Sequence, residues 1–121
     1  MKITEIAFSA YPVTDLTRSR AFYEGVLGLK PSFLGRAEAE ARWVEYEIGP
    51  HTLGIGVAEG WLPSKDGGSV GLEVEDFDAA IAELKAAGVT FRMEPFPTPV
   101  CRMAIISDPD GNSLLIHKRH A

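Results

Sequence analysis

The sequence has few of the features that would place a protein in a membrane or in an oxidising compartment. Its only cysteine, Cys101, cannot form an intrachain disulfide or half of a CxxC pair, which favours a reducing compartment. No apolar run approaches the ~18 residues that a membrane span requires. The N-terminal stretch carries Glu5 and lacks the apolar core of a signal peptide. We therefore expect a cytoplasmic protein that does not enter a membrane.

Basic residues are also too few and too scattered to bind a polyanion. Twelve Lys and Arg against 17 Asp and Glu give a formal charge of -5, so nucleic acid and anionic membranes are poor partners. With 45% hydrophobic residues over 121 positions, the chain is long enough for one domain with its own core. Neither a disulfide nor a metal is needed for folding alone.

A strand, a helix and three further extended runs occur twice along the chain. In the first half, β-forming and aromatic residues predict a strand over 3–12. Asp15 is a candidate N-cap, and apolar spacing predicts a helix over 16–27 that ends at Gly28. The extended runs that follow are 29–36, 41–48 and 52–58; Glu40, between two of them, is expected in an exposed loop.

After a linker over 59–68, the same pattern returns. A strand over 69–74 precedes the N-cap Asp76, a helix that ends at Gly88, and extended runs at 89–94, 101–107 and 113–118. Val13 and Asp15 fall on Val74 and Asp76 at an offset of 61 residues, which also carries 49–52 onto 110–113.

The repeat predicts an α+β fold. A single domain over 1–121 should consist of two pseudo-symmetric βαβββ units, 3–58 and 69–119. They should form a curved mixed, mostly antiparallel sheet with a concave cleft and with helices on the outer face.

Alternation within the strands assigns residues to the two faces of the sheet. The series beginning at Val44, Val70 and Leu114 are apolar and should pack under the helices. The opposite series should line the concave face: Trp43, Glu45, Glu47, Ser69, Gly71, Glu73, Ser113, Leu115 and His117.

Three segments carry a resemblance to a known family. They are YPVTDLTRSRAFYEGVLGL at 11–29, VEDFDAAIAELKAAGV at 74–89 and DPDGNSLLIHKR at 108–119. The chain resembles the vicinal oxygen chelate superfamily, which includes glyoxalases, extradiol dioxygenases, fosfomycin-resistance enzymes and bleomycin-resistance proteins. The resemblance implies the fold more closely than the chemistry, because one scaffold hosts several reactions and also pure binding.

Enzymes of this family hold a divalent metal at four positions, in the first and last strand of each unit. The resemblance places these positions at Phe8, Gly54, Ser69 and Leu115. Of these side chains only the Ser69 hydroxyl offers even a weak oxygen donor. We therefore expect no metal and no other cofactor.

The resemblance and the residues together favour a metal-independent small-molecule-binding protein that sequesters a cationic or aromatic toxic ligand, as bleomycin-resistance proteins do. The expected ligand-binding residues are Phe8, Trp43, Glu45, Ser69, Glu73, Leu115 and His117. The alternatives are a glyoxalase-type lyase, isomerase or dioxygenase that uses displaced metal ligands, and a structural dimer whose cleft its own side chains fill. Catalytic residues stay unassigned, and a homodimer is expected because such small sheets cover their edges.

Several candidate residues also have simpler interpretations. His117 could equally be a solvated residue near the C-terminus, and His51 belongs to a turn. Trp61 fits a lid or a dimer contact, and Phe96 fits a rigid loop between two prolines. Cys101 is expected to be a buried, inert thiol. A tight turn accounts for Asp108 and Asp110.

Overall fold

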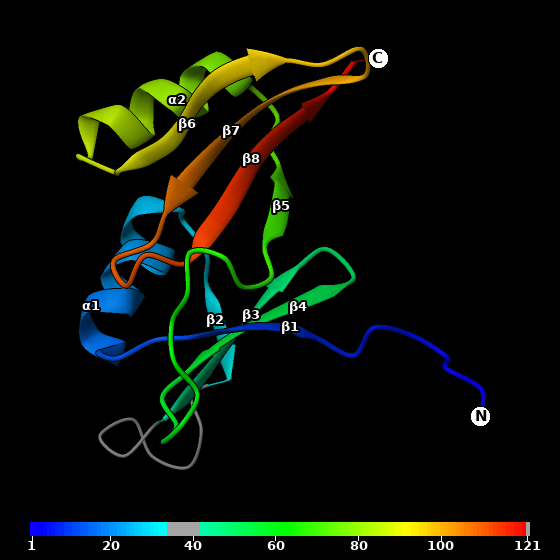
Figure 1. Ribbon diagram of the computed structural model, residues 1–121, viewed down its shortest axis with the longest axis vertical. Coiled ribbons are helices and arrows are strands. Elements are labelled where there is room, and N and C mark those ends of the chain that lie inside the picture. Colours follow the sequence, from blue (N-terminus) through cyan, green and yellow to red (C-terminus); the bar gives the residue numbers. More distant parts are fainter. Residues whose placement is uncertain (34–41, 121) are drawn as a thin grey trace. The chain divides into compact units, whose positions relative to one another are not determined.

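The chain divides into two compact units, Met1–Pro63 and Ser64–Ala121. The computed structural model describes residues 1–33 and 42–120, and Figure 1 shows its helices and strands. Each unit contains one strand, one helical segment and three further strands in that order. The α+β architecture of two βαβββ repeats is therefore confirmed.

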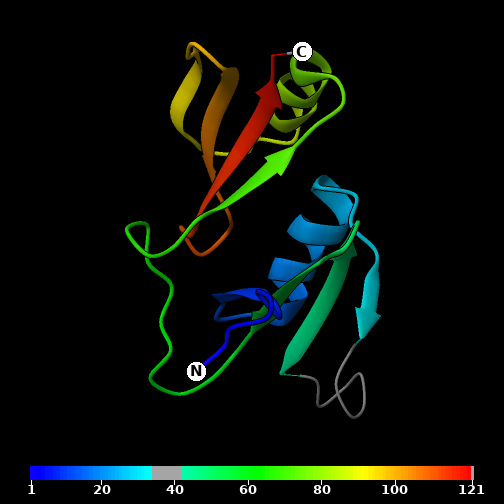
Figure 2. The same cartoon turned by 90° about the vertical axis from the view of Figure 1, so that its right-hand side faces the viewer.

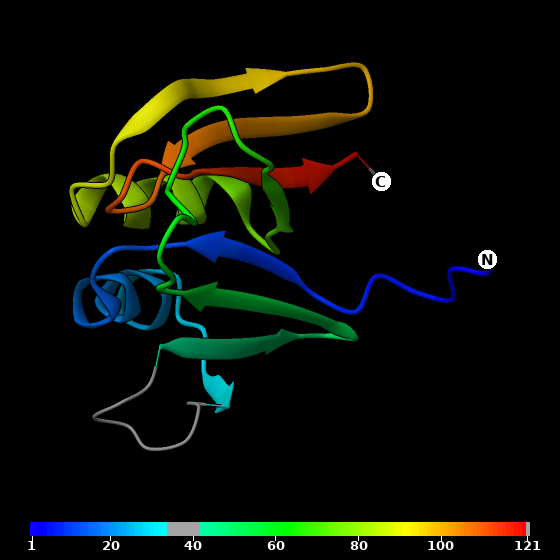
Figure 3. The ribbon, with the colours of Figure 1, turned by 60° about the horizontal axis from the view of Figure 1, so that its bottom comes forward.

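Unit 1 is a four-stranded sheet with one helical segment. Its elements are β1 (Ser9–Pro12), α1 (Leu16–Arg20), which continues as the π-helix η1 (Ala21–Val26), β2 (Pro31–Phe33), β3 (Trp43–Ile48) and β4 (His51–Gly56). The strand order is β1-β4-β3-β2. Strand β1 runs parallel to β4 and the other pairs are antiparallel. Figure 3 shows β1, β4 and β3 side by side.

Unit 2 repeats this topology. Its elements are β5 (Val70–Glu73), α2 (Phe77–Ala86), β6 (Phe91–Pro97), β7 (Cys101–Ser107) and β8 (Ser113–Arg119). The order β5-β8-β7-β6 matches that of unit 1. Strand β5 runs parallel to β8, and the other pairs are again antiparallel.

The offset of 61 residues that the sequence predicts is present in the strand register. Ala10 pairs with Gly54 in unit 1, and Gly71 pairs with Leu115 in unit 2. Both helices begin at the predicted aspartates. Asp15 accepts from the backbone N–H of Arg18 at 3.1 Å, and Asp76 accepts from the N–H of Ala79 at 3.0 Å. Such a cap contributes about 1 kcal/mol to helix stability.

One face of each sheet is buried. In unit 1, Val44 and Tyr46 are fully buried, as strand alternation predicted, and Ile48 of the same series is partly buried. Ile55 of β4 is fully buried as well. In unit 2 the corresponding set is Ala104, Ile106, Leu114 and Ile116. Phe77 and Leu84 of α2 are buried as well, and Figure 2 shows α2 along one face of the sheet. Each unit therefore buries its helix-facing residues and leaves the series of Trp43 or His117 on the opposite face.

The predicted first strand is too long. Residues 1–8 form no strand and are exposed, and Figure 3 shows this segment extending from β1. The reason is the partner strand. Ser9 pairs with Leu53, and β4 begins only at His51, directly after the turn at Gly49 and Pro50. Most of the preceding segment therefore has no neighbouring strand of this sheet to bond to, whatever its β propensity.

The first helix is not a regular α-helix throughout. Its second half is η1, in which the N–H of Leu27 bonds to the carbonyl of Phe22 at 3.0 Å. The wider turn accommodates two consecutive buried aromatic rings, Phe22 and Tyr23, and Tyr23 stacks on Tyr46 of β3. Apolar periodicity predicted a helix over 16–27, and the structure has a helical segment over 16–26; that its second half is π-helical is a detail that periodicity does not specify.

Two further expectations about the second half need correction. Phe96 does not lie in a loop but in β6, opposite Met103. Its flanking prolines are tolerated because β6 is an edge strand. The loop after β7, residues 108–112, is longer than its counterpart at 49–50, so the predicted match of the two turns does not hold residue by residue.

Several strand ends differ from prediction by a few residues. Strands β2, β3 and β4 occupy 31–33, 43–48 and 51–56, against predicted runs of 29–36, 41–48 and 52–58. The parts of these runs that fall within 34–41, together with Glu40, lie outside the described residues. In the part of the chain that is described, no helix is long and apolar enough to cross a membrane.

A partly buried polar contact joins the helical segment of unit 1 to its sheet. The Tyr46 hydroxyl donates to Glu24 at 2.9 Å, and the Arg20 guanidinium donates to the same carboxylate at 2.7 Å. Burial raises the pKa of Glu24, but the hydrogen bonds from Arg20 and Tyr46 outweigh it and hold that pKa below its usual value. Burial and the bond to Glu24 raise the pKa of Tyr46, so the phenol keeps its proton.

Tyr46→Phe should therefore lower the free energy of unfolding by about 1.5 to 3 kcal/mol at neutral pH. Because the pKa of Glu24 is depressed on folding, its contribution is present above the unfolded pKa, near 4.5, and is lost as the pH falls through the folded pKa. Urea denaturation across pH 2 to 7 should show the difference from wild type shrinking in acid. Glu83→Gln, an exposed helical glutamate of α2, is the control. An equal effect of both changes would contradict this account.

Candidate functional site

Three aromatic side chains gather on the exposed face of the unit 1 sheet. The ring of Trp43 is stacked with Trp61 at a centroid distance of 6.3 Å and 26°. Phe8 meets Trp43 edge-on at 5.5 Å and is 52% exposed. We call Phe8, Trp43 and Trp61 the aromatic cluster. Next to it, the Trp43 indole N–H donates to Glu45 at 2.7 Å, so a carboxylate lies at the edge of the aromatic surface.

Two glycines of β4 make room for the Trp43 ring. Trp43 pairs with Gly56 and Glu45 pairs with Gly54 across the β3–β4 ladder. A Cβ on Gly54 would lie 2.3 Å from Cζ2 of Trp43, and a Cβ on Gly56 would lie 2.7 Å from its Cε3. Both positions therefore require glycine while the indole lies flat against β4. Trp61 also approaches β4, because a Cβ on Gly56 would lie 3.2 Å from its Cζ3.

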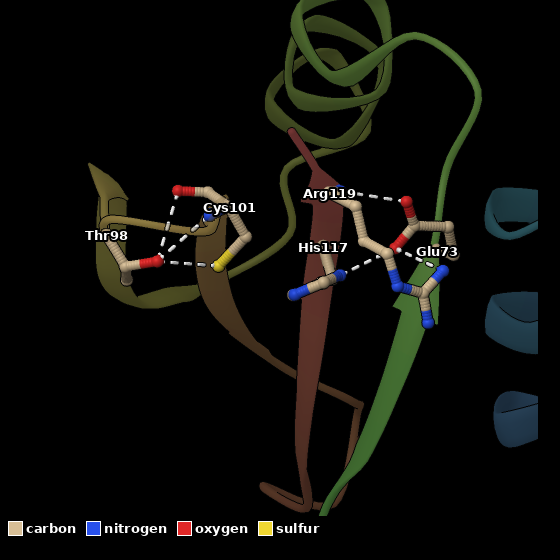
Figure 4. A network of polar contacts seen from close by, with 5 residues as sticks. All are labelled: Glu73, Thr98, Cys101, His117 and Arg119. Carbon is tan, nitrogen blue, oxygen red and sulfur yellow. Dashed lines mark hydrogen bonds and ion pairs between the residues drawn. The ribbon is translucent and has the colours of Figure 1, made fainter. Parts of the chain in front are cut away.

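In unit 2, Glu73 and His117 are partners across the β5–β8 ladder. Nδ1 of His117 lies 2.5 Å from Oε1 of Glu73. The backbone N–H of Arg119 donates to Oε2 of the same carboxylate at 2.9 Å, and the Arg119 guanidinium lies 3.9 Å from Oε1. Figure 4 shows the three residues together at the ends of β5 and β8. His117 is thus held within β8 and is not a frayed terminal residue.

The contacts of Glu73 determine its charge state. The backbone N–H of Arg119, followed by the hydrogen bond with His117, lowers the pKa of Glu73. A carboxylate that stays ionised only accepts hydrogen bonds, so Nδ1 of His117 is the donor in their contact. Glu73 therefore already bonds to His117 and Arg119 of its own unit, unlike a carboxylate with no partner in the protein.

The other predicted site residues stand apart from these two groups. Ser69 precedes β5 and is exposed, and Leu115 is partly exposed on the same face as His117. Glu47 and His51 are exposed near the β3–β4 turn, as predicted. Cys101 is buried, at 4% exposure, with its thiol 3.0 Å from the Thr98 hydroxyl, a contact that Figure 4 also shows.

The aspartate motif forms a turn. Asp108 accepts from the backbone N–H groups of Asp110 and Asn112, both at 2.9 Å. Asn112 in turn donates to Asp108 and accepts from the N–H of Ser64 at 3.2 Å. This network explains the motif structurally, as the sequence indicated, and adds an anchor for the segment that precedes β5.

Two residues of these surfaces were not identified from the sequence: Trp61 in the aromatic cluster and Arg119 beside Glu73. Trp61 was expected as a lid or a dimer contact, and its stacking on Trp43 within one unit has no local sequence signal. Arg119 contributes through its backbone N–H, and any residue other than proline supplies that group. Only the register of β5 on β8 could have identified it.

The four positions that the resemblance assigns to a metal do not fit one. Phe8, Gly54 and Leu115 carry no donor atom, and Ser69 offers one hydroxyl. In unit 1 the Trp43 ring also covers Gly54. Within residues 1–33 and 42–120, no group of three or more His, Cys, Asp or Glu side chains could hold a metal ion. The residues at these four positions therefore do not support a metal-dependent reaction.

Two βαβββ repeats, each with a four-stranded mixed sheet, define the class of α+β proteins to which this chain belongs. The family model "Glyoxalase/Bleomycin resistance protein/Dioxygenase superfamily" matches residues 3–116. The chain is a member of that superfamily, as the sequence motifs predicted. No functionally curated protein matches it.

Several solved structures resemble the chain over nearly its whole length. A superfamily member from Sphaerobacter thermophilus DSM 20745 is 27% identical, with a TM-score of 0.77 and coverage of 96% of this chain and 98% of the other. TnmS3, an antibiotic binding protein from Streptomyces sp. CB03234, is 26% identical, with a TM-score of 0.76 and 99% coverage of both chains. The fosfomycin resistance protein FosX from Mesorhizobium loti, at 22% identity, a TM-score of 0.73 and coverage of 97% and 93%, shares the fold.

Gly54→Ala should displace the Trp43 ring, because the added methyl group would occupy the position of the indole. We expect a loss of stability and a change in tryptophan fluorescence, since the stacking on Trp61 is disturbed. The matched control is Gly71→Ala, another strand glycine, whose Cβ would have no atom within 4 Å. Thermal unfolding followed by fluorescence measures both variants. An unchanged melting temperature and spectrum for Gly54→Ala would refute the stacking arrangement.

Proposed function

We propose that this protein binds a flat aromatic small molecule, without the help of a metal, on the aromatic cluster of unit 1. The observation that carries the proposal is the set of stacked and edge-on rings of Phe8, Trp43 and Trp61 on the exposed sheet face. Phe8 is exposed and the two tryptophans are partly exposed, and aromatic rings that reach the surface of a folded scaffold offer stacking area to a planar ligand. Its physiological role would be to sequester a toxic compound.

Charge favours a cationic ligand. Glu45 lies beside the Trp43 ring, and the chain has a formal charge of -5. A cation over an indole face is attracted by the ring as well as by the carboxylate. TnmS3, which has the same fold, is described as an antibiotic binding protein. This similarity supports the proposal that the present chain also binds a small molecule. The expected ligand-binding residues Phe8, Trp43 and Glu45 belong to this surface.

The metal-dependent alternative is less well supported by the contacts. It requires several displaced ligands in one place, and within residues 1–33 and 42–120 no three His, Cys, Asp or Glu side chains are grouped to hold a metal ion; Glu73 is in addition bonded to His117 and Arg119. The buried free Cys101 is compatible with a reducing compartment, and a cytoplasmic location stays a prediction.

The binding function can be tested with proflavine, a flat aromatic cation. Trp43→Ala removes the stacking plane, and Glu45→Gln removes the charge while its amide oxygen still accepts the indole N–H. Each change should weaken proflavine binding about tenfold or more, measured by fluorescence titration. Glu47→Gln, on the same strand face and exposed, removes the same charge and should have little effect.

Two outcomes would contradict this function. An equal loss of affinity in Glu47→Gln would mean that only net charge matters. Undiminished binding in Trp43→Ala and Glu45→Gln would place the dye away from the aromatic cluster.

Metal independence has its own test. Protein purified without a His tag should contain far less than one transition metal per chain by elemental analysis, because the family positions hold Phe8, Gly54, Ser69 and Leu115. Proflavine affinity should be the same with and without a strong chelator. A stoichiometric metal whose removal abolishes binding would refute this part of the proposal.

We also propose that the protein assembles as a homodimer. Strands β1 and β5 are edge strands of their sheets, and exposed edges tend to be covered by assembly. Light scattering at tens of micromolar should give twice the chain mass of 13.1 kDa. A monomer mass would contradict the proposal.

A further inference from the structure

The His117 imidazole has one nitrogen engaged and one available. Nδ1 contacts Glu73 at 2.5 Å. No described residue bonds to Nε2, and the side chain is 28% exposed. Figure 4 shows this second nitrogen turned away from Glu73. Because the two ring nitrogens point in different directions, the contact of Nδ1 with Glu73 leaves Nε2 facing away from that carboxylate.

The tautomer follows from the partner. Glu73 is held ionised by the N–H of Arg119 and by His117, so it accepts the Nδ1 hydrogen. In the neutral ring, Nε2 then carries a lone pair and no hydrogen. The carboxylate thereby fixes both the ring orientation and the accepting nitrogen. A carboxylate that accepts from the other ring nitrogen of a metal-bound histidine acts in the same way.

The surroundings of His117 are suited to the carbon skeleton of a ligand. Residues directly opposite in neighbouring strands share a face, so Met103 of β7 lies beside His117, and Ile105 lies beside Leu115. These three apolar side chains are partly exposed. Gly71 lies on the other side of Leu115, and no atom is within 4 Å of the Cβ it lacks. The surface there is apolar and open.

The charged and titratable groups of this face are few. Glu73 comes from β5, Arg119 from β8, and Cys101, which is buried, from β7 opposite Arg119. From β6, the Arg92 guanidinium donates to the Ser113 hydroxyl, at the opposite end of β8 from Arg119. Each carboxylate oxygen of Glu73 already accepts one hydrogen bond within the unit, whereas Nε2 of His117 accepts none from the described residues.

We propose that Nε2 of His117 accepts the hydrogen bond of a weakly acidic hydroxyl group, such as a phenol, on a small molecule whose carbon skeleton rests on Met103 and Leu115. Glu73 is a positioning residue for this contact. The site lies within unit 2, and it does not depend on the aromatic cluster of unit 1.

The test compares 4-nitrophenol with 4-nitroanisole, its methyl ether, which lacks the hydroxyl hydrogen. Wild type should bind the phenol about tenfold or more tightly than the ether by calorimetric titration. His117→Gln should bring the two affinities close together. His51→Gln, at an exposed turn histidine, should leave the preference unchanged. Trp43→Ala should not alter the ratio, even if it weakens both, so this result is separate from the proflavine experiment.

The role of Glu73 has a spectroscopic readout. Nitrogen NMR of the imidazole should show the Nδ1–H tautomer of His117 in wild type and a mixture of tautomers in Glu73→Ala. Glu73→Gln, whose amide oxygen still accepts from Nδ1, should retain part of the phenol preference.

Three results would overturn the proposal. The first is equal affinity of wild type for 4-nitrophenol and 4-nitroanisole, or no binding of either compound. The second is an unchanged preference for the phenol in His117→Gln. The third is a His117 tautomer with its hydrogen on Nε2.

Discussion

The parallel pairing of the first and last strand in each unit is the constraint on which both candidate surfaces depend. Ala10 is in register with Gly54, and Gly71 with Leu115. A slip of one residue would move every side chain of a strand to the other face. It would bury Glu73 and His117 under α2 and expose the apolar residues of the core. The same pairing sets the length of β1, because β4 begins at His51 and offers nothing to most of the chain before Ser9.

Equivalent register positions in the two units carry different chemistry. In unit 1 a row of three paired residues consists of Pro12, Gly56 and Trp43. In unit 2 the corresponding row consists of Glu73, His117 and Met103. The first row makes a flat aromatic surface because Gly56 has no side chain and the indole lies over it. The second makes a polar pair because an acid and an imidazole occur side by side. One backbone arrangement therefore supports two unlike surfaces.

The resemblance to the superfamily's enzymes places four metal positions in the first and last strand of each unit, and in this chain these positions hold Phe8, Gly54, Ser69 and Leu115. The Trp43 ring covers Gly54, one of the family positions, and Leu115 contributes apolar surface at another. Glu73 and His117, which do carry donor atoms, bond to each other, and Glu73 also accepts from the backbone N–H of Arg119. The arrangement suits hydrogen bonding and stacking with an organic molecule. It leaves the fold unchanged, because the core residues lie on the opposite face of each sheet.

The sequence by itself determined the repeat, its offset of 61 residues, the helix caps at Asp15 and Asp76, and which face of each strand carries Trp43, Glu45, Glu73 and His117. These features are local, because alternation, capping and turn chemistry depend on nearby residues. The tertiary structure decided the rest. The π-helical turn at Phe22 and Tyr23 depends on packing against Tyr46, and the strand status of Phe96 depends on its edge position. The stacking of Trp61 on Trp43 and the bond of Arg119 to Glu73 join residues distant in sequence. Such contacts are set by strand register and chain reversal, which no local pattern specifies.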